Sequence, residues 1–348
     1  MTPKERVLRS IRHEAVDRTP CFYLGGKVDA ALAERLGVSA DDGEALLQRL
    51  GADVRYVWPR LVPAPGEVRY GYNCGAVHAR LHNQPGDHGP AAYPVGDAQT
   101  VEDLDRWRWP DPDWYDYTIP PDRAAAWRDQ AVVAYDMGIL FLFAMGVRGL
   151  EQLMMDMACE PELAHEVFRR IADYNLERTR RFLASNAGLI DLVGLGDDVA
   201  GQGGMVISPA MWRQYLRPHL ERMVALCREF SVIPYFHGCG GFRDLYPDFI
   251  EMGIPCTGRL QTEARGNDLR DLKRQFGRDL CFWGAIDGQH VTVSGTPDQV
   301  RAHVREVLRI GSQHSGFVAG PTHSFTEDTP IENVVAVYEV LGNRGPHT

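Results

Sequence analysis

Leu189-Ile-Asp-Leu-Val193 is a short apolar run that ends at Gly194, and it begins the stretch of sequence that decides the fold. From here onward the chain alternates apolar runs of strand length with longer segments of helical periodicity. The next strand candidates centre near residues 233, 255, 281 and 317, and a helical segment follows each of them. Strands that alternate with helices in this way form a parallel sheet that the helices cover.

The first half of the chain supplies three further strand candidates, near residues 21, 54 and 133, after a helix predicted over residues 3–14. Eight such strands, in a chain longer than the ~250 residues typical of the fold, predict a (β/α)8 TIM barrel. A doubly wound open sheet is the alternative, but no Gly-x-Gly-x-x-Gly motif opens a helix after the first strand. We therefore expect a single α/β barrel domain over residues 1–348.

A long segment from Pro59 to Ala124 interrupts this order after the second strand. It is rich in proline, glycine and aromatic residues, and it holds three of the twelve histidines. A connection of this length inside a compact domain is commonly a lid or a binding loop. We expect the insertion, residues 59–124, to cover the mouth of the barrel, and packing on the flank of the barrel is the alternative.

Composition and charge exclude several classes of protein. There are 37 Lys and Arg residues against 47 Asp and Glu residues, a net charge of −10, so nucleic acid is not an expected partner. No apolar run approaches the ~18–20 residues of a membrane span, and the N-terminus lacks the apolar core of a signal peptide. Seven cysteines without a repeated spacing do not make a disulfide framework. We expect a reduced, cytoplasmic protein.

Residues that could bind a metal ion follow the later strands, at the end of the barrel where such enzymes carry their active sites. His237-Gly-Cys239 gives the sharpest local signal, because an imidazole and a thiolate two residues apart suit zinc. A catalytic zinc site takes three protein ligands. His323, after the final strand, is the first candidate for the third ligand, and Cys256 is the weaker one. A buried histidine beside an inert thiol is the alternative interpretation.

Two adjacent carboxylates, Asp197 and Asp198, follow Gly196 at the end of another strand. Neighbouring side chains point in different directions, so we expect one of the two to face the mouth. There it would act in catalysis together with His323, or orient His237. Capping of a helix N-terminus is the alternative.

Five further residues at strand ends are candidates for binding a small-molecule substrate. They are Lys27, Arg60, Asp136, Gln261 and Asp287.

Several segments spread over nearly the whole chain together resemble the uroporphyrinogen decarboxylase superfamily. They are Thr2-Pro-Lys-Glu-Arg-Val7 with Asp17-Arg-Thr-Pro20, Gly196-Asp-Asp-Val-Ala-Gly-Gln202 with Ser208-Pro209, Phe236-His-Gly-Cys-Gly240, Phe282-Trp-Gly-Ala-Ile-Asp287, and Gly320-Pro-Thr-His323 with Thr329-Pro330 and Glu332-Asn333. The resemblance implies a barrel and one of two chemistries. One is decarboxylation of porphyrinogen acetate groups without a cofactor, and the other is zinc-dependent methyl transfer to or from a corrinoid carrier.

The chain departs from both branches of this superfamily. Decarboxylases carry an arginine-rich stretch after the first strand, where Tyr23-Leu-Gly-Gly-Lys27 has no arginine, and an aspartate after the second, where Val57-Trp-Pro-Arg60 has none. A substrate with many carboxylates needs such cations. The methyltransferase branch matches at His237-Gly-Cys239, but its thiol-activating members have a third cysteine ligand where this chain has His323.

The leading hypothesis is therefore a methyltransferase whose zinc is bound by His237, Cys239 and His323. It would move a methyl group between a small methoxy, amine or thiol compound and a corrinoid carrier protein. The alternative is a cofactor-free decarboxylase acting on a carboxylate substrate. A catalytically inert binding barrel is the third hypothesis, because fold does not imply function. A second copy of the chain, forming a homodimer, is a further candidate partner.

Overall fold

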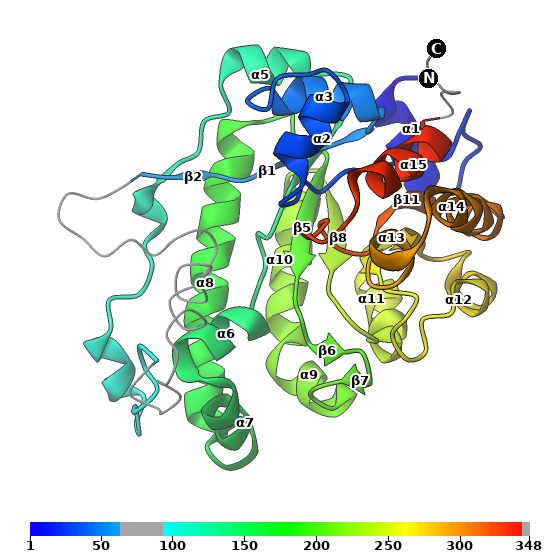
Figure 1. Ribbon diagram of the computed structural model, residues 1–348. Coiled ribbons are helices and arrows are strands. Elements are labelled where there is room, and N and C mark those ends of the chain that lie inside the picture. The colour runs from blue at the N-terminus through cyan, green and yellow to red at the C-terminus, as the bar shows by residue number, and fades with distance from the viewer. Residues whose placement is uncertain (63–92, 343–348) are drawn as a thin grey trace.

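The computed structural model describes residues 1–62 and 93–342, and within them seven parallel strands form one sheet. Their order in the sheet follows their order in the chain (Figure 1), as repeated strand-helix units require. The strands are Val54–Val57 (β1), Ala131–Ala134 (β4), Leu192–Gly196 (β5), Ile233–His237 (β8), Cys256–Leu260 (β9), Cys281–Ile286 (β10) and Phe317–Pro321 (β11).

Residues 20–22 connect the two edges of this sheet. Cys21 forms a parallel bridge with Ala319 of β11, and the carbonyl of Cys21 accepts the N–H of Asp53, just before β1, at 2.8 Å. Because one short segment reaches both edge strands, the sheet is curled and resembles a TIM barrel. The predicted strand near residue 21 is reduced to this single bridge, and the other seven predicted strands are present.

Helices lie outside the sheet (Figure 1). They are Pro3–Ile11 (α1), Asp29–Arg35 (α2), Gly43–Leu50 (α3), Pro121–Ala126 (α5), Phe141–Arg148 (α6), Leu150–Cys159 (α7), Pro161–Ser185 (α8), Pro209–Tyr215 (α9), Arg217–Glu229 (α10), Tyr246–Met252 (α11), Leu269–Phe276 (α12), Val291–Ser294 (α13), Pro297–Gly311 (α14) and Ile331–Leu341 (α15). Within the described residues, 3-10 turns span Glu102–Arg106, Pro112–Trp114 and Arg243–Leu245. Two antiparallel pairs join Arg60–Leu61 (β2) to Tyr115–Asp116 (β3) and Ala200–Gly201 (β6) to Gly204–Met205 (β7). None of the helices in the described ranges is long and apolar enough to cross a membrane.

The inside of the curled sheet is an apolar cluster built from alternate residues of the strands. Its largest members are Phe22, Tyr135, Tyr235 and Trp283, all almost fully buried. Helix α1 completes the cluster with Val7 and Ile11. The Lys4 N–H donates to the Asp129 carbonyl and the Ser10 hydroxyl donates to the Phe317 carbonyl, so α1 lies at the N-terminal ends of β4 and β11. The C-terminal ends of the strands form the opposite mouth.

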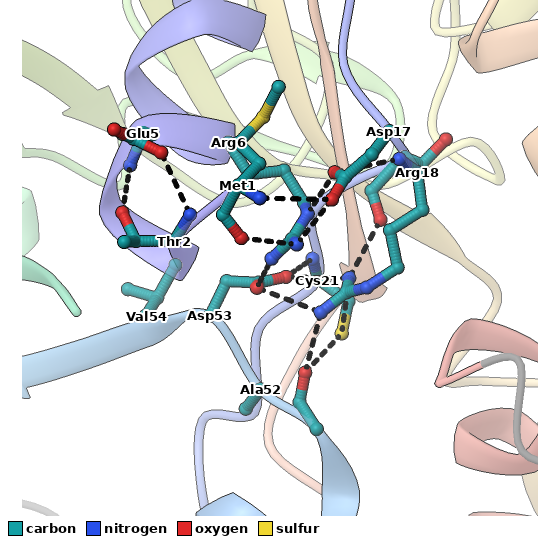
Figure 2. Close-up of polar contacts among 12 residues, drawn as sticks. Met1, Thr2, Glu5, Arg6, Asp17, Arg18, Cys21, Ala52, Asp53 and Val54 are labelled. Atoms are coloured by element: carbon teal, nitrogen blue, oxygen red, sulfur yellow. Dashed lines mark hydrogen bonds and ion pairs between the residues drawn. The ribbon is translucent and has the colours of Figure 1, made fainter. Parts of the chain in front are cut away.

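A buried ion cluster fixes α1 to the closure of the sheet (Figure 2). The Asp53 carboxylate is fully buried, and it accepts hydrogen bonds from Arg6 at 2.6 Å and Arg18 at 2.8 Å. The backbone N–H of Cys21 donates to the same carboxylate at 2.8 Å. Asp17 also pairs with Arg6, at 2.6 Å. This cluster therefore belongs to the N-terminal end of the barrel and not to its mouth.

Residues 109–117 of the insertion pack along the outside of α8, whereas residues 121–124 begin α5, which lines the cavity described below. Trp109 lies under the guanidinium of Arg170, and the Tyr115 hydroxyl contacts the Tyr174 hydroxyl at 2.6 Å. The side chain of Asn186, after α8, donates to the Tyr117 carbonyl at 2.7 Å. Residues 63–92 of the predicted insertion lie outside the described residues. Covering of the mouth by the insertion stays a prediction.

Several element bounds differ from the predicted ones for local reasons. From the sequence alone one helix is expected over residues 209–229, but the structure has two, because Pro218 starts a new helix at the second residue of α10. The apolar run Ile139–Phe143, a further strand candidate in the sequence, leads into α6, which begins at Phe141. A strand is expected over residues 254–258, whereas β9 begins two residues later and includes Arg259.

Candidate active site

Strand β8 delivers His237 to the mouth of the barrel, and a tight glycine turn brings Cys239 beside it. A Cβ atom at Gly238 would lie 2.6 Å from the Asp197 carbonyl oxygen, so only glycine fits there. Gly240 has a φ of +81°, which also favours glycine. The backbone N–H of Cys239 donates to the Asp198 carboxylate at 2.8 Å.

His237 is buried and has a defined hydrogen-bond partner. The hydroxyl of Tyr135, just after β4, lies 3.0 Å from Nδ1 of His237. Burial lowers the pKa of His237 well below its usual value, and the charge of Arg259 lowers it further. The imidazole is therefore neutral at physiological pH, which is the form that binds metal ions.

The surroundings of Cys239 keep its side chain protonated. Burial raises the pKa of its thiol to about 12, and the neighbouring Asp198 carboxylate raises it as well, while Arg259 opposes this shift. Without a metal ion the side chain is a thiol and not a thiolate at neutral pH. A bound metal ion would have to displace this proton.

His323 follows β11, and the charge of Arg259 acts on it as it acts on His237 and Cys239. It is exposed, its Nδ1 lies 3.3 Å from the Ser324 carbonyl, and its pKa is lowered by surrounding protein atoms and then by Arg259. The potential ligand atoms of His237, Cys239 and His323 do not all lie within 4.8 Å of one another in the described chain. Cys256, the other candidate ligand, is buried in the apolar cluster inside the sheet.

The two adjacent aspartates point to different partners. The Asp197 carboxylate accepts the backbone N–H groups of Leu140 at 3.0 Å, Phe141 and Leu142 at 2.8 Å, so it caps the N-terminus of α6. Burial raises the pKa of Asp197 to about 7, although these N–H groups lower it. Asp198 is the member of the pair that reaches Cys239.

The five predicted substrate-binding residues do not lie together in one site. Lys27 and Arg60 are exposed and pair with Glu327 and Asp116, at 3.4 and 2.6 Å. Gln261 is buried and accepts the Gly240 N–H at 2.8 Å, so it supports the turn that carries Cys239.

The remaining two candidates lie in separate clusters. Asp136 lines a cavity described below. Asp287 lies with Glu263 and His290, and potential ligand atoms of these three residues lie within 4.8 Å of one another. Burial, with the neighbouring Asp287 carboxylate adding to it, raises the pKa of Glu263 to about 8, so Glu263 is mostly protonated at neutral pH. The sequence analysis did not select Glu263 and His290, although the spacing Asp287-x-x-His290 after a strand was a visible signal.

A cavity of about 710 Å³ opens beside this site. Its outer wall comes from α2, α3 and α5, and its inner wall includes Tyr56, Tyr135, Asp136 and Arg259. Arg259 connects the cavity to the candidate metal ligands, because its charge acts on His237, Cys239 and His323. The volume is in the range of small-molecule binding sites.

A barrel-like sheet with its polar residues at the C-terminal strand ends defines the class of site found in TIM-barrel enzymes. The sequence profile of the uroporphyrinogen decarboxylase (URO-D) family matches residues 131–343, more than half of the chain. The chain therefore belongs to the uroporphyrinogen decarboxylase family.

Characterised relatives represent both branches of this family. A methylated-thiol–coenzyme M methyltransferase of Methanosarcina mazei is 26% identical over 196 residues, which cover 56% of this chain and 49%, about half, of the relative. A methylcobamide:CoM methyltransferase of the same organism is 22% identical over 339 residues, covering 89% of this chain and 90% of the relative. The uroporphyrinogen decarboxylase of Thermus thermophilus is 25% identical over 178 residues, covering 50% of this chain and 48% of the relative.

The fold has a counterpart among solved structures. A methyltransferase from Methanosarcina mazei superposes with a TM-score of 0.63 at 17% sequence identity, covering 99% of both chains. This similarity shows that the two proteins share a fold.

Proposed function

We propose that this chain is a zinc-dependent methyltransferase that moves a methyl group between a small methylated compound and a corrinoid carrier. The observation that carries the proposal is the pair His237 and Cys239, presented together at the end of β8 with a hydrogen-bond partner each. The similarity over 89% of the chain to a protein named for methylcobamide and CoM supports it.

The donor set fits zinc in its chemistry. One thiol and two imidazoles, from Cys239, His237 and His323, are ligands that zinc prefers. Tyr135 and Asp198 form the hydrogen bonds that orient the first two, as outer residues around metal sites do. When bound, zinc would supply a Lewis acid that polarises the heteroatom bearing the methyl group.

The transfer itself requires little proton chemistry from the protein. The bond between methyl carbon and heteroatom breaks with its electron pair left on the heteroatom, and the methyl carbon bonds to the electron pair of the acceptor. The heteroatom that loses the methyl group takes up a proton. Asp198 is the carboxylate that faces Cys239, and we assign it to positioning of this ligand.

Metal content tests the proposal. Purified protein should hold about one zinc per chain, as expected of one three-ligand site. Cys239→Ser should lower zinc affinity at least tenfold, because a thiolate ligand is lost. Cys227→Ser is the matched control, since Cys227 is a buried thiol on α10 away from the mouth, and it should retain the metal. Protein that neither contains nor binds zinc would refute the proposed mechanism.

A further inference from the structure

The glycine turn that carries Cys239 is enclosed by two other loops at the mouth of the barrel. A Cβ atom at Gly240 would lie 2.6 Å from the Gly201 carbonyl oxygen, at the end of β6. A Cβ atom at Gly241 would lie 2.5 Å from a backbone carbonyl oxygen of the loop after β9. The Gly241 N–H also donates to the Gly201 carbonyl at 3.0 Å. Close backbone contacts on both sides therefore restrict the conformation of this turn.

Gln261 binds the turn from the loop after β9. Its side chain is buried, and its Oε1 accepts the Gly240 N–H at 2.8 Å. The same oxygen accepts a hydrogen bond at 2.9 Å from Nε2 of Gln202, in the loop between β6 and β7. One amide oxygen therefore joins the Cys239 turn to both of the loops that enclose it.

Asn267 forms a second side-chain contact to the same peptide segment. It is 1% exposed, and its Nδ2 donates to the carbonyls of Gly240 and Gln261, each at 3.0 Å. Gly240 lies outside the helices and strands, so no ladder satisfies its backbone groups. Side chains of one loop instead bind both its N–H and its carbonyl, one residue after Cys239.

The position of Cys239 depends on these contacts more than that of His237 does. His237 belongs to β8, which the neighbouring strands hold, whereas Cys239 lies beyond the end of the strand. Neither Gln261 nor Asn267 carries a group that zinc prefers as a ligand. They have instead the position of outer residues, which orient the ligands around a metal ion.

We propose that Gln261 and Asn267 are positioning residues that hold the Cys239 turn, before any metal binds, in the conformation that presents Cys239 beside His237. The inference deepens the proposed function and rests on it for the identity of the metal. Both residues then set the affinity for zinc without contacting the ion. A contribution to folding alone is the alternative.

Matched variants separate these two roles. Gln261→Met and Asn267→Leu keep the approximate size of each side chain and remove its hydrogen bonds to the turn. Asn333→Leu is the control, because Asn333 is equally buried and its Nδ2 also donates to two backbone carbonyls, of Thr292 and Gly295, at 2.9 and 2.8 Å. All three variants lose comparable hydrogen bonds, and only the first two lose them at the Cys239 turn.

Hydrogen exchange of the full chain, stripped of metal by a chelator and resolved to single amides by NMR, measures the hold on the turn. The Gly241 amide is the reporter, since its own acceptor, the Gly201 carbonyl, is unchanged in every variant. It should exchange about tenfold faster in Gln261→Met and Asn267→Leu, and as in the parent in the control. Unchanged exchange in both turn variants, or equally raised exchange in the control, would overturn the inference.

Metal titration connects the turn to the candidate ligands. Both turn variants should bind zinc about tenfold to hundredfold more weakly than the parent, whereas Asn333→Leu should bind it equally well. With Co²⁺ in place of zinc, the absorption of the thiolate–metal bond should be weaker per bound ion in the turn variants, because Cys239 is held less well. Zinc affinity within about twofold of the parent's in both turn variants would overturn the inference.

The two measurements distinguish failure of this inference from failure of the proposed function. A parent that binds no zinc, with faster Gly241 exchange in both turn variants, would refute the zinc-dependent mechanism and retain the positioning residues. A parent that binds zinc, with neither exchange nor affinity changed in the variants, would do the reverse.

Discussion

At the scale of single residues, the mouth of the barrel imposes different protonation states on two neighbouring side chains. Burial raises the pKa of Cys239 to about 12 and lowers that of His237 well below its usual value. The pKa of His323 is lowered as well. Near neutral pH the two imidazoles are therefore already free of the protons that a metal ion would displace, and the thiol is not.

This difference predicts the pH dependence of zinc binding. Zinc should displace one proton, from Cys239, so its apparent affinity should rise about tenfold per pH unit between pH 6 and 8. Competition with a chelator of known proton affinity, measured at three pH values, gives this slope. In Cys239→Ser the slope should fall toward zero. A parent slope near two or three would mean that the histidines also release protons, and it would contradict the pKa shifts given above.

The sequence predicted where some residues of the candidate site lie and could not predict others. His237 and Cys239 are close in sequence and follow an apolar run, so local pattern was sufficient to place both at a strand end. Their role as metal ligands stays a prediction. The proximity of Arg259 to His237, Cys239 and His323, and of Tyr56 to Tyr135, becomes visible only in three dimensions. Arg259 and Tyr56 come from strands about 200 residues apart, and neither has a motif around it.

At the scale of elements, one carboxylate positions a helix. Asp197, at the end of β5, accepts three backbone N–H groups at the N-terminus of α6. The sequence analysis allowed both a catalytic and a capping role for this residue. The three hydrogen bonds that Asp197 accepts support the capping role. Asp198 is then the better candidate for a functional role at the mouth of the barrel.

Asp197→Ala should therefore destabilise the protein. Removing the carboxylate leaves two buried N–H groups and one part-buried N–H group without an acceptor, which should cost roughly 2–4 kcal/mol of unfolding free energy. Asp268→Ala, which removes an exposed cap from α12, should cost about 1 kcal/mol. Urea denaturation of both variants measures the difference. Equal losses of unfolding free energy in the two variants would contradict the conclusion that the Asp197 cap stabilises the protein more than an exposed cap does.

Elements with strong periodicity were predicted more reliably than their ends. The long helix α8 and the strands β8 and β10 follow the predicted positions within a few residues. The apolar run Ile139–Phe143 was ambiguous because a short apolar run suits a buried strand and a buried helix equally. Here the Asp197 cap, a contact across 55 to 57 residues, favours the helix.

At the scale of the whole molecule, the curled sheet was predictable and the charge of its cavity was not. Alternating strands and helices indicated the parallel order that the structure shows. The Asp53 cluster, which ties α1 and Arg18 to the closure of the sheet, joins residues 35 and 47 positions apart (Figure 2). Such ion pairs have no local signature. The balance of charges around the cavity likewise becomes visible only when the chain is folded.

That balance predicts that uroporphyrinogen is not a substrate. The cavity lining in the described chain has Asp29, Glu44, Asp122 and Asp136 against Arg123 and Arg259, so its acidic groups outnumber its cations. A tetrapyrrole with several carboxylates would bring further negative charge into this space, and each buried carboxylate without a partner costs several kcal/mol.

Incubation of the protein with uroporphyrinogen under reducing conditions, followed by mass measurement, should show no loss of carbon dioxide. A uroporphyrinogen decarboxylase assayed in parallel confirms that the substrate is intact. Turnover at an ordinary enzymatic rate, about 1–10³ per second, would contradict this argument from charge. It would also place the chain in the decarboxylase branch of its family, because a single interior arginine would then suffice for a polycarboxylate.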